Sequence, residues 1–396
     1  MRVLHTSDWH LGRSFHRVGL LEHQAAFVDH LLAVVEQEEV DLVVLSGDVY
    51  DRALPPVDAV ELADEVFARL AASRAQVVVT SGNHDSQIRL GFNARLADAA
   101  GVHLRTRWQD VGTPVLLEDR HGPVAVYGLP YLEPDAVRVP WRLERRSHEA
   151  TLTEAMRRVH ADLDGRRGAR SVVMAHAFVA GDAERGAQMA CESERDISVG
   201  GLQIAPTHLF TGVDYAALGH LHGRQTLTDS VRYSGSPLAY SFSEATHRKG
   251  SWLVELGRDG LERVDFVEAP VPRRLATLRG DLEDLLADPT HASLEDCWLQ
   301  VTLTDARRPR HAMERLRTRF PETLLLSFEP EGRRADRGPL VPRVDGRSDL
   351  DVALGFVAEV RELEATTEEA LLLQLACDSC RVNEDADRPV VVEEAG

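Results

Sequence analysis

Lysine is almost absent from this sequence of 396 residues: Lys249 is the only one, and arginine supplies the other basic side chains. Acidic residues outnumber basic ones by 64 to 45, so the formal net charge is −19 at pH 7. This balance excludes binding to nucleic acid through a uniformly basic surface. It leaves open an enzyme that acts on nucleic acid at one local site, because metal ions can neutralise phosphate there.

Long apolar runs and cysteine are also scarce. No apolar stretch approaches the roughly 20 residues that a membrane span needs, and the sequence begins on Arg2-Val3-Leu4-His5 without a signal-peptide pattern. Cysteines at positions 191, 297, 377 and 380 are too few and too scattered for a disulfide framework. Cys377 and Cys380 have the spacing of half a zinc site or a redox pair, and coincidence in a helical tail is the alternative. We expect a cytoplasmic protein with no membrane segment.

Charge is distributed unevenly along the chain. Residues 345–396 hold 14 acidic side chains and four arginines, a net charge of −10, which is about half of the whole deficit. Residues 137–170 hold nine arginines against five acidic residues, and residues 305–319 hold six against two. The arginines of 305–319 are candidate phosphate contacts, and a solvated helix face is the alternative.

Strand and helix patterns alternate through the first two thirds of the sequence. Short apolar runs predict strands near 2–7, 41–46, 76–81, 124–128 and 171–175, and helical spacing covers 20–40, 57–73 and 147–163. Continuous apolar runs are typical of strands that are buried on both faces. Three later strands, at 231–233, 251–256 and 261–267, are expected to be antiparallel and to finish a sheet. The order predicts an α/β sandwich for residues 1–270.

Two prolines in Ala269-Pro270-Val271-Pro272 indicate a domain boundary. We expect residues 271–331 to form a small α+β cap in the order strand, helix, strand, helix, strand. Residues 332–347 read as a linker, and residues 348–396 as an acidic helical tail whose last dozen residues are disordered. The irregular stretch between His176 and Asp214 predicts a long functional loop.

Five short pieces end apolar strands with side chains that bind metal ions. Their donors are oxygen and nitrogen atoms that suit Mn²⁺, Fe²⁺ or Zn²⁺. Ligand sites of open α/β sheets gather at the carboxyl ends of strands, where all five pieces lie. The pieces are Asp8-Trp9-His10, Gly47-Asp48-Val49-Tyr50-Asp51, Gly82-Asn83-His84-Asp85, His176 and Gly219-His220-Leu221-His222.

We hypothesise a binuclear centre in which Asp48 bridges two ions, as one carboxylate can at a separation of roughly 3.5–4 Å. Asp8, His10 and His222 complete one ion, whereas Asn83, His176 and His220 complete the other. If the stretch after Gly219 is extended, His220 and His222 lie on the same side and reach different ions. His84 is left over as the group that protonates the leaving oxygen or stabilises the phosphorane. Asp51 and Asp85 are expected to orient the turn or nearby imidazoles. The other twelve histidines, His5 among them, are expected on the surface or as satisfied structural groups.

These residues resemble the calcineurin-like metallophosphoesterase superfamily, whose pattern DxH, GDxxD, GNHD, a later His and GHxH is matched piece by piece. Within it, the sequence is similar to the SbcD family of nuclease subunits. This similarity covers residues 7–13, 46–52, 81–86, 219–222 and 233–237. The resemblance implies a two-sheet sandwich flanked by helices, with the cap and the tail appended. It implies the same metal ligands, Asp8, His10, Asp48, Asn83, His176, His220 and His222, and His84 as a catalytic histidine that does not bind metal.

The resemblance further implies two Mn²⁺ ions, with Mg²⁺, Fe²⁺ or Zn²⁺ as alternatives, and hydrolysis of phosphodiester bonds in DNA. Double-stranded ends would be degraded exonucleolytically, and single strands and hairpins cut endonucleolytically, in DNA repair, recombination and replication. A homodimer would assemble with two SbcC ATPase subunits at the nucleoid. ATP would be used only by SbcC. The cap would contact DNA, and apolar residues of the acidic tail would bind the base of the SbcC coiled coil.

Two other functions are open. A small-molecule phosphodiesterase or a phosphatase could use the same scaffold, because fold and metals do not fix the substrate. A metal-free binding scaffold usually requires lost ligands, and none is lost here. Turnover of plasmid or hairpin DNA, compared with turnover of cyclic nucleotides, would separate the two enzymes.

Overall fold

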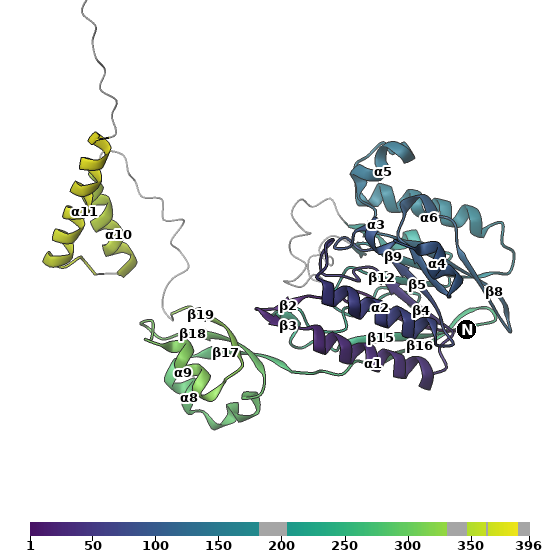
Figure 1. The fold of residues 1–396 in the computed structure, drawn as a ribbon, viewed down its shortest axis with the longest axis horizontal. Coiled ribbons are helices and arrows are strands. Elements are labelled where there is room, and N and C mark those ends of the chain that lie inside the picture. The colour runs from purple at the N-terminus through teal and green to yellow at the C-terminus, as the bar shows by residue number, and fades with distance from the viewer. Residues whose placement is uncertain (182–203, 331–346, 362, 387–396) are drawn as a thin grey trace, which may run out of the picture. The chain divides into compact units, whose positions relative to one another are not determined.

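The structure is a computed structural model that describes residues 1–181, 204–330, 347–361 and 363–386. Residues 1–331 form one compact unit and residues 332–396 a second. The expected linker and the end of the tail lie almost wholly outside the described residues, as does most of the expected loop after His176. Figure 1 gives the element labels used below.

The first six-stranded sheet has the order β16-β15-β1-β4-β5-β6. Its parallel part comprises β1 (Arg2–Thr6), β4 (Leu42–Ser46), β5 (Gln76–Thr80) and β6 (Val102–Arg105). A hairpin of β15 (Gly250–Gly257) and β16 (Gly260–Glu268) adds to it, with β15 antiparallel to β1. The four parallel strands all end at the same edge.

The second six-stranded sheet has the order β13-β14-β12-β9-β8-β7. Four of its strands are parallel: β8 (Gly122–Leu129), β9 (Arg170–His176), β12 (Tyr215–Gly219) and β14 (Val231–Tyr233). Its edges are the antiparallel strands β7 (Val115–Asp119) and β13 (Gln225–Thr226). The expectation that strands 231–233, 251–256 and 261–267 jointly finish one sheet is wrong, because residues 234–249 cross from the second sheet to the first.

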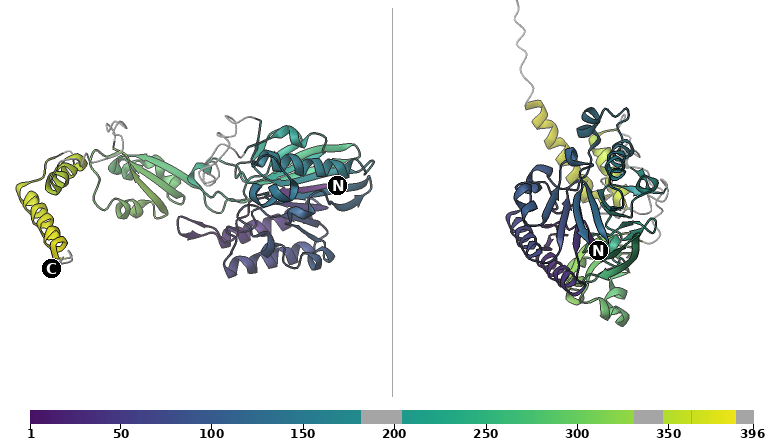
Figure 2. Two further views of the ribbon diagram at one scale, coloured as in Figure 1. Left: turned by 90° about the horizontal axis from the view of Figure 1, so that it is seen from above. Right: turned by 90° about the vertical axis from the view of Figure 1, so that its right-hand side faces the viewer.

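The two sheets pack face to face, with helices on both outer faces (Figures 1 and 2). Valine and aromatic side chains of both sheets, including Val44, Val172 and Trp252, form the core between them. Helices α1 (Leu21–Gln37) and α2 (Val57–Ala71) cover the first sheet. Helices α5 (Pro134–Trp141) and α6 (His148–Leu163) cover the second. Because both faces of each sheet are buried, the strands read as continuous apolar runs. The predicted sandwich is confirmed.

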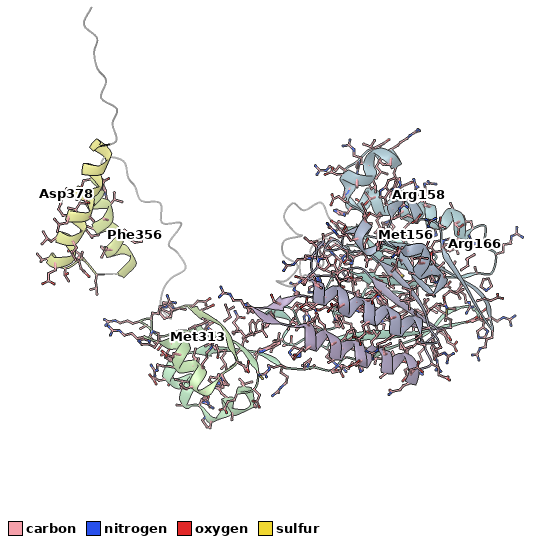
Figure 3. All side chains as sticks on the ribbon, in the orientation of Figure 1. Met156, Arg158, Arg166, Met313, Phe356 and Asp378 are labelled. Carbon is pink, nitrogen blue, oxygen red and sulfur yellow. The ribbon has the colours of Figure 1, made fainter. Side chains whose placement is uncertain are left out.

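Helix α6 shows how local sequence sets an element. Ser147 precedes the helix and its hydroxyl accepts from the backbone N–H of Ala150 at 3.2 Å, which satisfies a free helix donor. Met156 is buried in the second core, whereas Arg158 lies over the Trp141 ring at 4.5 Å from its centroid (Figure 3). One face of the helix therefore binds the sheet while the arginine-rich face stays outside.

Buried His5 is a structural histidine, as expected. Its side chain is inaccessible to solvent, and its ring nitrogens contact the Tyr215 hydroxyl at 2.9 Å and the Leu218 carbonyl at 3.1 Å. A carbonyl only accepts, so Nε2 carries the proton and Nδ1 accepts from Tyr215. Burial lowers the pKa of His5 to about 3, which keeps the ring neutral.

The region after the double proline has the predicted order of strands and helices, and its three strands are parallel. The elements are β17 (Leu275–Gly280), α8 (Leu282–Ala287), β18 (Trp298–Leu303), α9 (Ala312–Arg319) and β19 (Thr323–Phe328). They enclose a separate apolar core that includes Leu299 and Phe320. Trp298 leaves this core and stacks on Phe15, with ring centroids 5.5 Å apart. Phe15 lies in the hairpin β2 (Ser14–Phe15) and β3 (Val18–Gly19), which the sequence did not predict.

The second unit contains a helix pair, α10 (Asp349–Arg361) and α11 (Thr367–Ala386), so the prediction of a helical tail is confirmed. Phe356 on α10 and Leu371, Leu372 and Leu375 on α11 are exposed (Figure 3 labels Phe356). Cys377 is a free thiol on α11, and the side chain of Cys380 lies outside the described part. None of the described helices combines the length and the apolar content needed to cross a membrane.

Candidate metal centre

The five pieces predicted to bind metal meet at one place, where β1, β4, β5, β9 and β12 end. The imidazoles and carboxylates proposed as ligands are all buried there, and none is more than 3% exposed. These side chains are Asp8, His10, Asp48, His176, His220 and His222. So many ionisable groups stay buried only when partners or metal ions compensate them.

Of the ten described non-glycine residues with positive φ, four are proposed ligands. Asp8, His10, Asp48 and His220 have positive φ angles of 54°, 47°, 50° and 103°. Positive φ is uncommon outside glycine, and such residues cluster at functional sites. The turns after the strands are therefore held in an unfavourable conformation that aims the side chains inward.

Two glycines permit the close approach of the ligands. A Cβ atom on Gly82 would lie 2.0 Å from Oδ1 of Asp48, and one on Gly47 would lie 2.2 Å from Nδ1 of His176. Gly47 also has φ +84°. Any side chain at either position would displace a ligand residue, which explains glycine before Asp48 and before Asn83.

The donor atoms form two sets. In the first, Nε2 of His10 lies 3.1 Å from Nε2 of His222, and a carboxylate oxygen of Asp8 lies within 4.8 Å of a nitrogen of each ring. In the second, Oδ1 of Asn83 lies 3.0 Å from both Nε2 of His176 and Nδ1 of His220. These sets correspond to those that the hypothesis assigns to two ions, and Asp8 also lies within 4.8 Å of Asp48 and His176.

Asp48 lies between the sets. Its Oδ2 atom is 3.6 Å from Nε2 of His10 and 3.3 Å from Nε2 of His176. Its Oδ1 atom accepts from the backbone N–H of His84 at 2.9 Å. One carboxylate oxygen therefore faces both sets while the other fixes the carboxylate plane.

The expectation of an extended backbone at His220 and His222 is wrong. Strand β12 ends at Gly219, and the φ of 103° at His220 turns the chain there. His220 faces the second set through Nδ1, whereas His222 faces the first through Nε2. The bend and the choice of nitrogen, rather than strand alternation, send the two rings to different sets.

Electrostatics favour neutral imidazoles at His10 and His220, and a protonated one at His176, around an ionised carboxylate. Burial holds the pKa of His10 and of His220 well below the usual value. Burial alone would raise the pKa of Asp48, but the nearby imidazoles, His176 foremost, hold it well below its usual range. Burial would lower the pKa of His176, and the Asp48 carboxylate instead raises it to about 9. Nδ1 of His176 donates to the Ser46 carbonyl at 2.9 Å, so Nε2 is the atom that offers a lone pair to a cation.

Asp51 and Asp85 lie behind the ligands. Oδ1 of Asp51 is 3.6 Å from Nδ1 of His10 and 3.3 Å from a guanidinium nitrogen of Arg13. The Asp85 carboxylate accepts three backbone N–H bonds at 2.9 to 3.1 Å, from Val49, Tyr50 and Gly82. Asp85 thereby ties together the turns that carry Asp48 and Asn83.

His84 differs from the ligand residues in being only partly buried. Its ring lies edge to face with His10, at a centroid distance of 4.8 Å. Nδ1 donates to the carbonyl of Asp51 at 2.8 Å, so Nε2 remains to take up or release a second proton. His84 also lies near enough to His10 and Asp48 to form a group that could hold a metal ion.

Sequence reasoning missed several groups that surround the ligands. The Ser7 hydroxyl hydrogen-bonds to the Asp8 carboxylate. Glu244 lies 3.6 Å from Nδ1 of His222 and is paired with Lys249. The one signal for this pair was that Lys249 is the only lysine of the chain.

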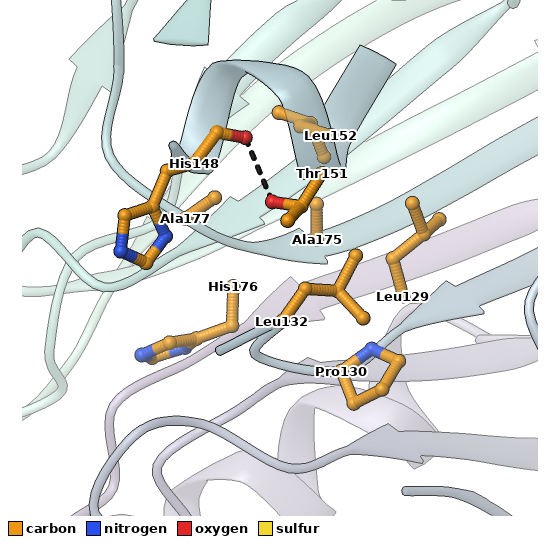
Figure 4. Close-up of a pocket in the computed structure, with 9 residues that line it drawn as sticks. All are labelled: Leu129, Pro130, Leu132, His148, Thr151, Leu152, Ala175, His176 and Ala177. Carbon is orange, nitrogen blue, oxygen red and sulfur yellow. Dashed lines mark hydrogen bonds between the residues drawn. The ribbon is translucent and has the colours of Figure 1, made fainter. Parts of the chain in front are cut away.

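A small pocket lies beside His176 (Figure 4). Leu129, Leu132 and Leu152 supply apolar walls, and the Thr151 hydroxyl donates to the carbonyl of His148 at 2.8 Å. The ring of His176 points away from these leucines (Figure 4). The donors themselves, seven oxygen- and nitrogen-bearing side chains without sulfur, fit divalent ions of the Mn²⁺, Fe²⁺ or Zn²⁺ type.

Two family models match parts of this chain. The calcineurin-like phosphoesterase family model matches residues 1–224, and the model SbcD_C, described as the type 5 capsule protein repressor C-terminal domain, matches residues 271–361. Among solved structures, TT1561 of Thermus thermophilus is 15% identical, with 67% of this chain and 98% of that chain covered and a TM-score of 0.39. A dimetal phosphatase from Danio rerio is 14% identical, with coverages of 68% and 99% and a TM-score of 0.39. The chain belongs to the calcineurin-like phosphoesterase family, is a metal-dependent hydrolase, and has an SbcD-like architecture.

Proposed function

We propose that the chain is a two-metal DNA nuclease and the D subunit of an SbcCD complex that acts at the nucleoid in DNA repair, recombination and replication. The observation that carries the proposal is the position of Asp48 Oδ2, at 3.6 Å and 3.3 Å from the two donor sets. One carboxylate in this position suits a pair of ions that acts on a phosphodiester. The SbcD_C match over residues 271–361 supports DNA as the substrate.

The residues of the site have different roles. Asp8, His10 and His222 would hold one Mn²⁺, Asn83, His176 and His220 the other, and Asp48 both. When bound, the ions supply an activated water and neutralise charge on the phosphate. His84, fixed through Nδ1, holds at Nε2 the proton that the leaving oxygen needs. Asp51 and Asp85 orient the imidazole of His10 and the two ligand turns.

The arginines of the cap support a role in DNA contact. They fall into two groups, one with partners inside the cap and one without partners in the part of the chain that the structure describes. Arg315, Arg317 and Arg319 are used internally, with Glu283, the Thr323 carbonyl and Glu295 as partners. The other three are exposed on the loop before α9 and form no hydrogen bond or ion pair within the described residues. These three, Arg307, Arg308 and Arg310, are the proposed phosphate contacts.

A homodimer is supported by an apolar patch close to the ligand turns. Leu54, Val57, Ile88 and Phe92 are between 68% and 86% exposed. Their two segments are joined by a hydrogen bond from Arg89 to the Ala53 carbonyl at 3.1 Å. An exposed cluster of this kind marks a protein contact surface. Replacing Ile88 and Phe92 by Glu should give a monomer by light scattering, and a dimer that persists would reject this surface.

The SbcC partner is assigned to the second unit. Phe356 of α10 and Leu371, Leu372 and Leu375 of α11 present apolar side chains in an acidic background. Amphipathic helices bind partner helices through such faces. ATP would act only through SbcC.

The deciding experiment is cleavage of end-labelled duplex and hairpin DNA, with and without SbcC, ATP and Mn²⁺. We expect Mn²⁺-dependent cleavage that is lost with Asp48→Ala and His84→Gln, and duplex cleavage that requires SbcC and ATP. Turnover of cyclic nucleotides without any cleavage of DNA would instead establish the small-molecule phosphodiesterase.

A further inference from the structure

The single lysine of the chain is buried behind the metal centre. Lys249 is 6% exposed, and its ammonium has three acceptors. They are Oε2 of Glu244 at 2.5 Å, the backbone carbonyl of His222 at 2.8 Å and Oγ of Ser236 at 2.9 Å. The three N–H bonds of the ammonium are thereby all used.

Glu244 connects this lysine to a proposed ligand. The side chain is 1% exposed and lies in the short 3₁₀ helix η4 (Phe242–Glu244). Its Oε1 atom is 3.6 Å from Nδ1 of His222 and accepts from the Ser241 hydroxyl at 3.0 Å. Nε2 of the same imidazole faces His10 at 3.1 Å, so the two ring nitrogens point to opposite surroundings.

The contacts form a closed ring around His222. Lys249 binds the backbone carbonyl of His222 and also Glu244, and Glu244 faces the side chain of His222. The backbone and the imidazole of one residue are thus held by the same ion pair. His10 also faces an ion pair, Asp51 with Arg13, but Asp51 is 18% exposed, and His176 has the Ser46 carbonyl behind it.

A carboxylate behind an imidazole determines how that ring binds a metal. It favours the proton on the nitrogen that faces it, so the opposite nitrogen offers its lone pair. For His222 this leaves Nε2 as the ligand atom, on the side of Asp8 and His10. A charged partner for Glu244 is needed because an unpaired carboxylate is costly in the interior.

We propose that Glu244 and Lys249 are a positioning pair that orients Nε2 of His222 toward the ion shared with Asp8 and His10. This inference rests on the proposed metal centre and adds two residues to it that do not touch the ion or the substrate. The pair should therefore govern the affinity of one ion and leave the other unchanged.

The test is a Mn²⁺ titration of the full chain followed by calorimetry and by electron paramagnetic resonance, which separates coupled ion pairs from single ions. We expect wild type to bind two ions, and Glu244→Gln to bind one of them 10- to 100-fold more weakly. The double variant Glu244→Gln with Lys249→Met removes both charges at similar size, so its loss of affinity cannot be assigned to a stranded buried charge. The matched control is Glu268→Gln. Glu268 is the exposed ion-pair partner of Arg248, the residue directly before Lys249. This variant should bind both ions with the affinity of wild type.

His222→Ala provides the reference for the same ion. Glu244→Gln should cause no further loss in that background, because the pair acts through the imidazole. Isotope labelling of lysine gives a second readout, since Lys249 must give the only side-chain signal. That signal should shift when Zn²⁺ fills the site in wild type and should not shift in His222→Ala.

The outcomes separate the two proposals. If wild type binds no divalent ion, the metal centre and the positioning pair both fail. If wild type binds two ions and Glu244→Gln binds both with unchanged affinity, only the pair is overturned. Equal weakening of both ions, or a loss that also appears in Glu268→Gln, would show a general structural role and would overturn it too.

Discussion

Nε2 of His10 and Nε2 of His222 lie 3.1 Å apart in the buried interior of the protein. Each ring has a carboxylate on its Nδ1 side, Asp51 for His10 and Glu244 for His222, which favours the proton on Nδ1 and leaves a lone pair on each Nε2. A cation shared by both lone pairs removes the repulsion between them. The close pair is therefore better explained by metal binding than by a hydrogen bond.

Replacing the central carboxylate should disturb both ions at once. In Asp48→Asn the amide would be about the same size but would lack the charge that faces both donor sets. We expect less than one ion per chain by elemental analysis and at least a hundredfold loss in hydrolysis of bis-p-nitrophenyl phosphate. Retention of two tightly bound ions would reject the bridging role.

Loss of His84 should separate metal binding from catalysis. In His84→Gln we expect two bound ions and a cleavage rate about 10² to 10⁴ times lower, the range typical of a general acid. The measurements are metal content and single-turnover cleavage across pH. Loss of an ion together with activity would instead make His84 a ligand.

Metal affinity should rise with pH. The Asp48 carboxylate raises the pKa of His176 to about 9 against the effect of burial, so His176 holds a proton below that pH. A cation has to displace this proton. We therefore expect Mn²⁺ affinity to increase from pH 7 toward 9. Calorimetry in two buffers of different ionisation enthalpy should detect the released proton, and equal heats in both buffers would contradict this.

Stability should fall as the solution becomes acidic, in part because of His5. Its pKa is lowered by burial from 6.5 to about 3, so the unfolded chain takes up this proton first as pH falls. The resulting loss of stability runs between pH 6.5 and 3 and reaches about 2 kcal/mol at pH 5. Urea unfolding of wild type and of His5→Gln at pH 7 and pH 5 measures it. An equal pH dependence in both proteins would exclude His5 as the cause.

Removing the second unit should abolish partner binding without abolishing chemistry. A chain that ends after residue 346 keeps all proposed ligands and loses the exposed leucines of α11. We expect no association with SbcC in a pull-down and unchanged Mn²⁺-dependent cleavage of small phosphodiesters. Association retained by the truncated chain would place the SbcC contact elsewhere.

The meeting of the proposed ligands at one place could be predicted because each follows an apolar strand, and parallel strands bring their ends together. Asp8, Asp48, Asn83, His176 and His220 follow this rule directly. Sheet membership could not be predicted, since nothing local in Val231–Tyr233 tells which sheet it joins. The bend at His220 was missed because a positive φ on histidine has no reliable sequence signal.

Glu244 was also beyond prediction, for another reason. It is 22 residues from His222 in the sequence, in a segment without a recognised metal-binding pattern, and only the crossing of the chain between sheets brings them together. Lys249 was conspicuous as a single lysine, yet rarity alone does not assign a contact. The contacts of Glu244 and Lys249 with His222 arise from long-range packing, which local periodicity does not reveal.

The stacking of Trp298 on Phe15 couples two parts of the first unit mechanically. Phe15 is five residues beyond His10, and the backbone between them passes through Gly12, where a Cβ would lie 2.9 Å from that of Ala59. Because Gly12 packs this closely against Ala59, the backbone between His10 and Phe15 has little room to move. A displacement of β18 would therefore reach the turn that carries His10 through only the few residues between Phe15 and His10.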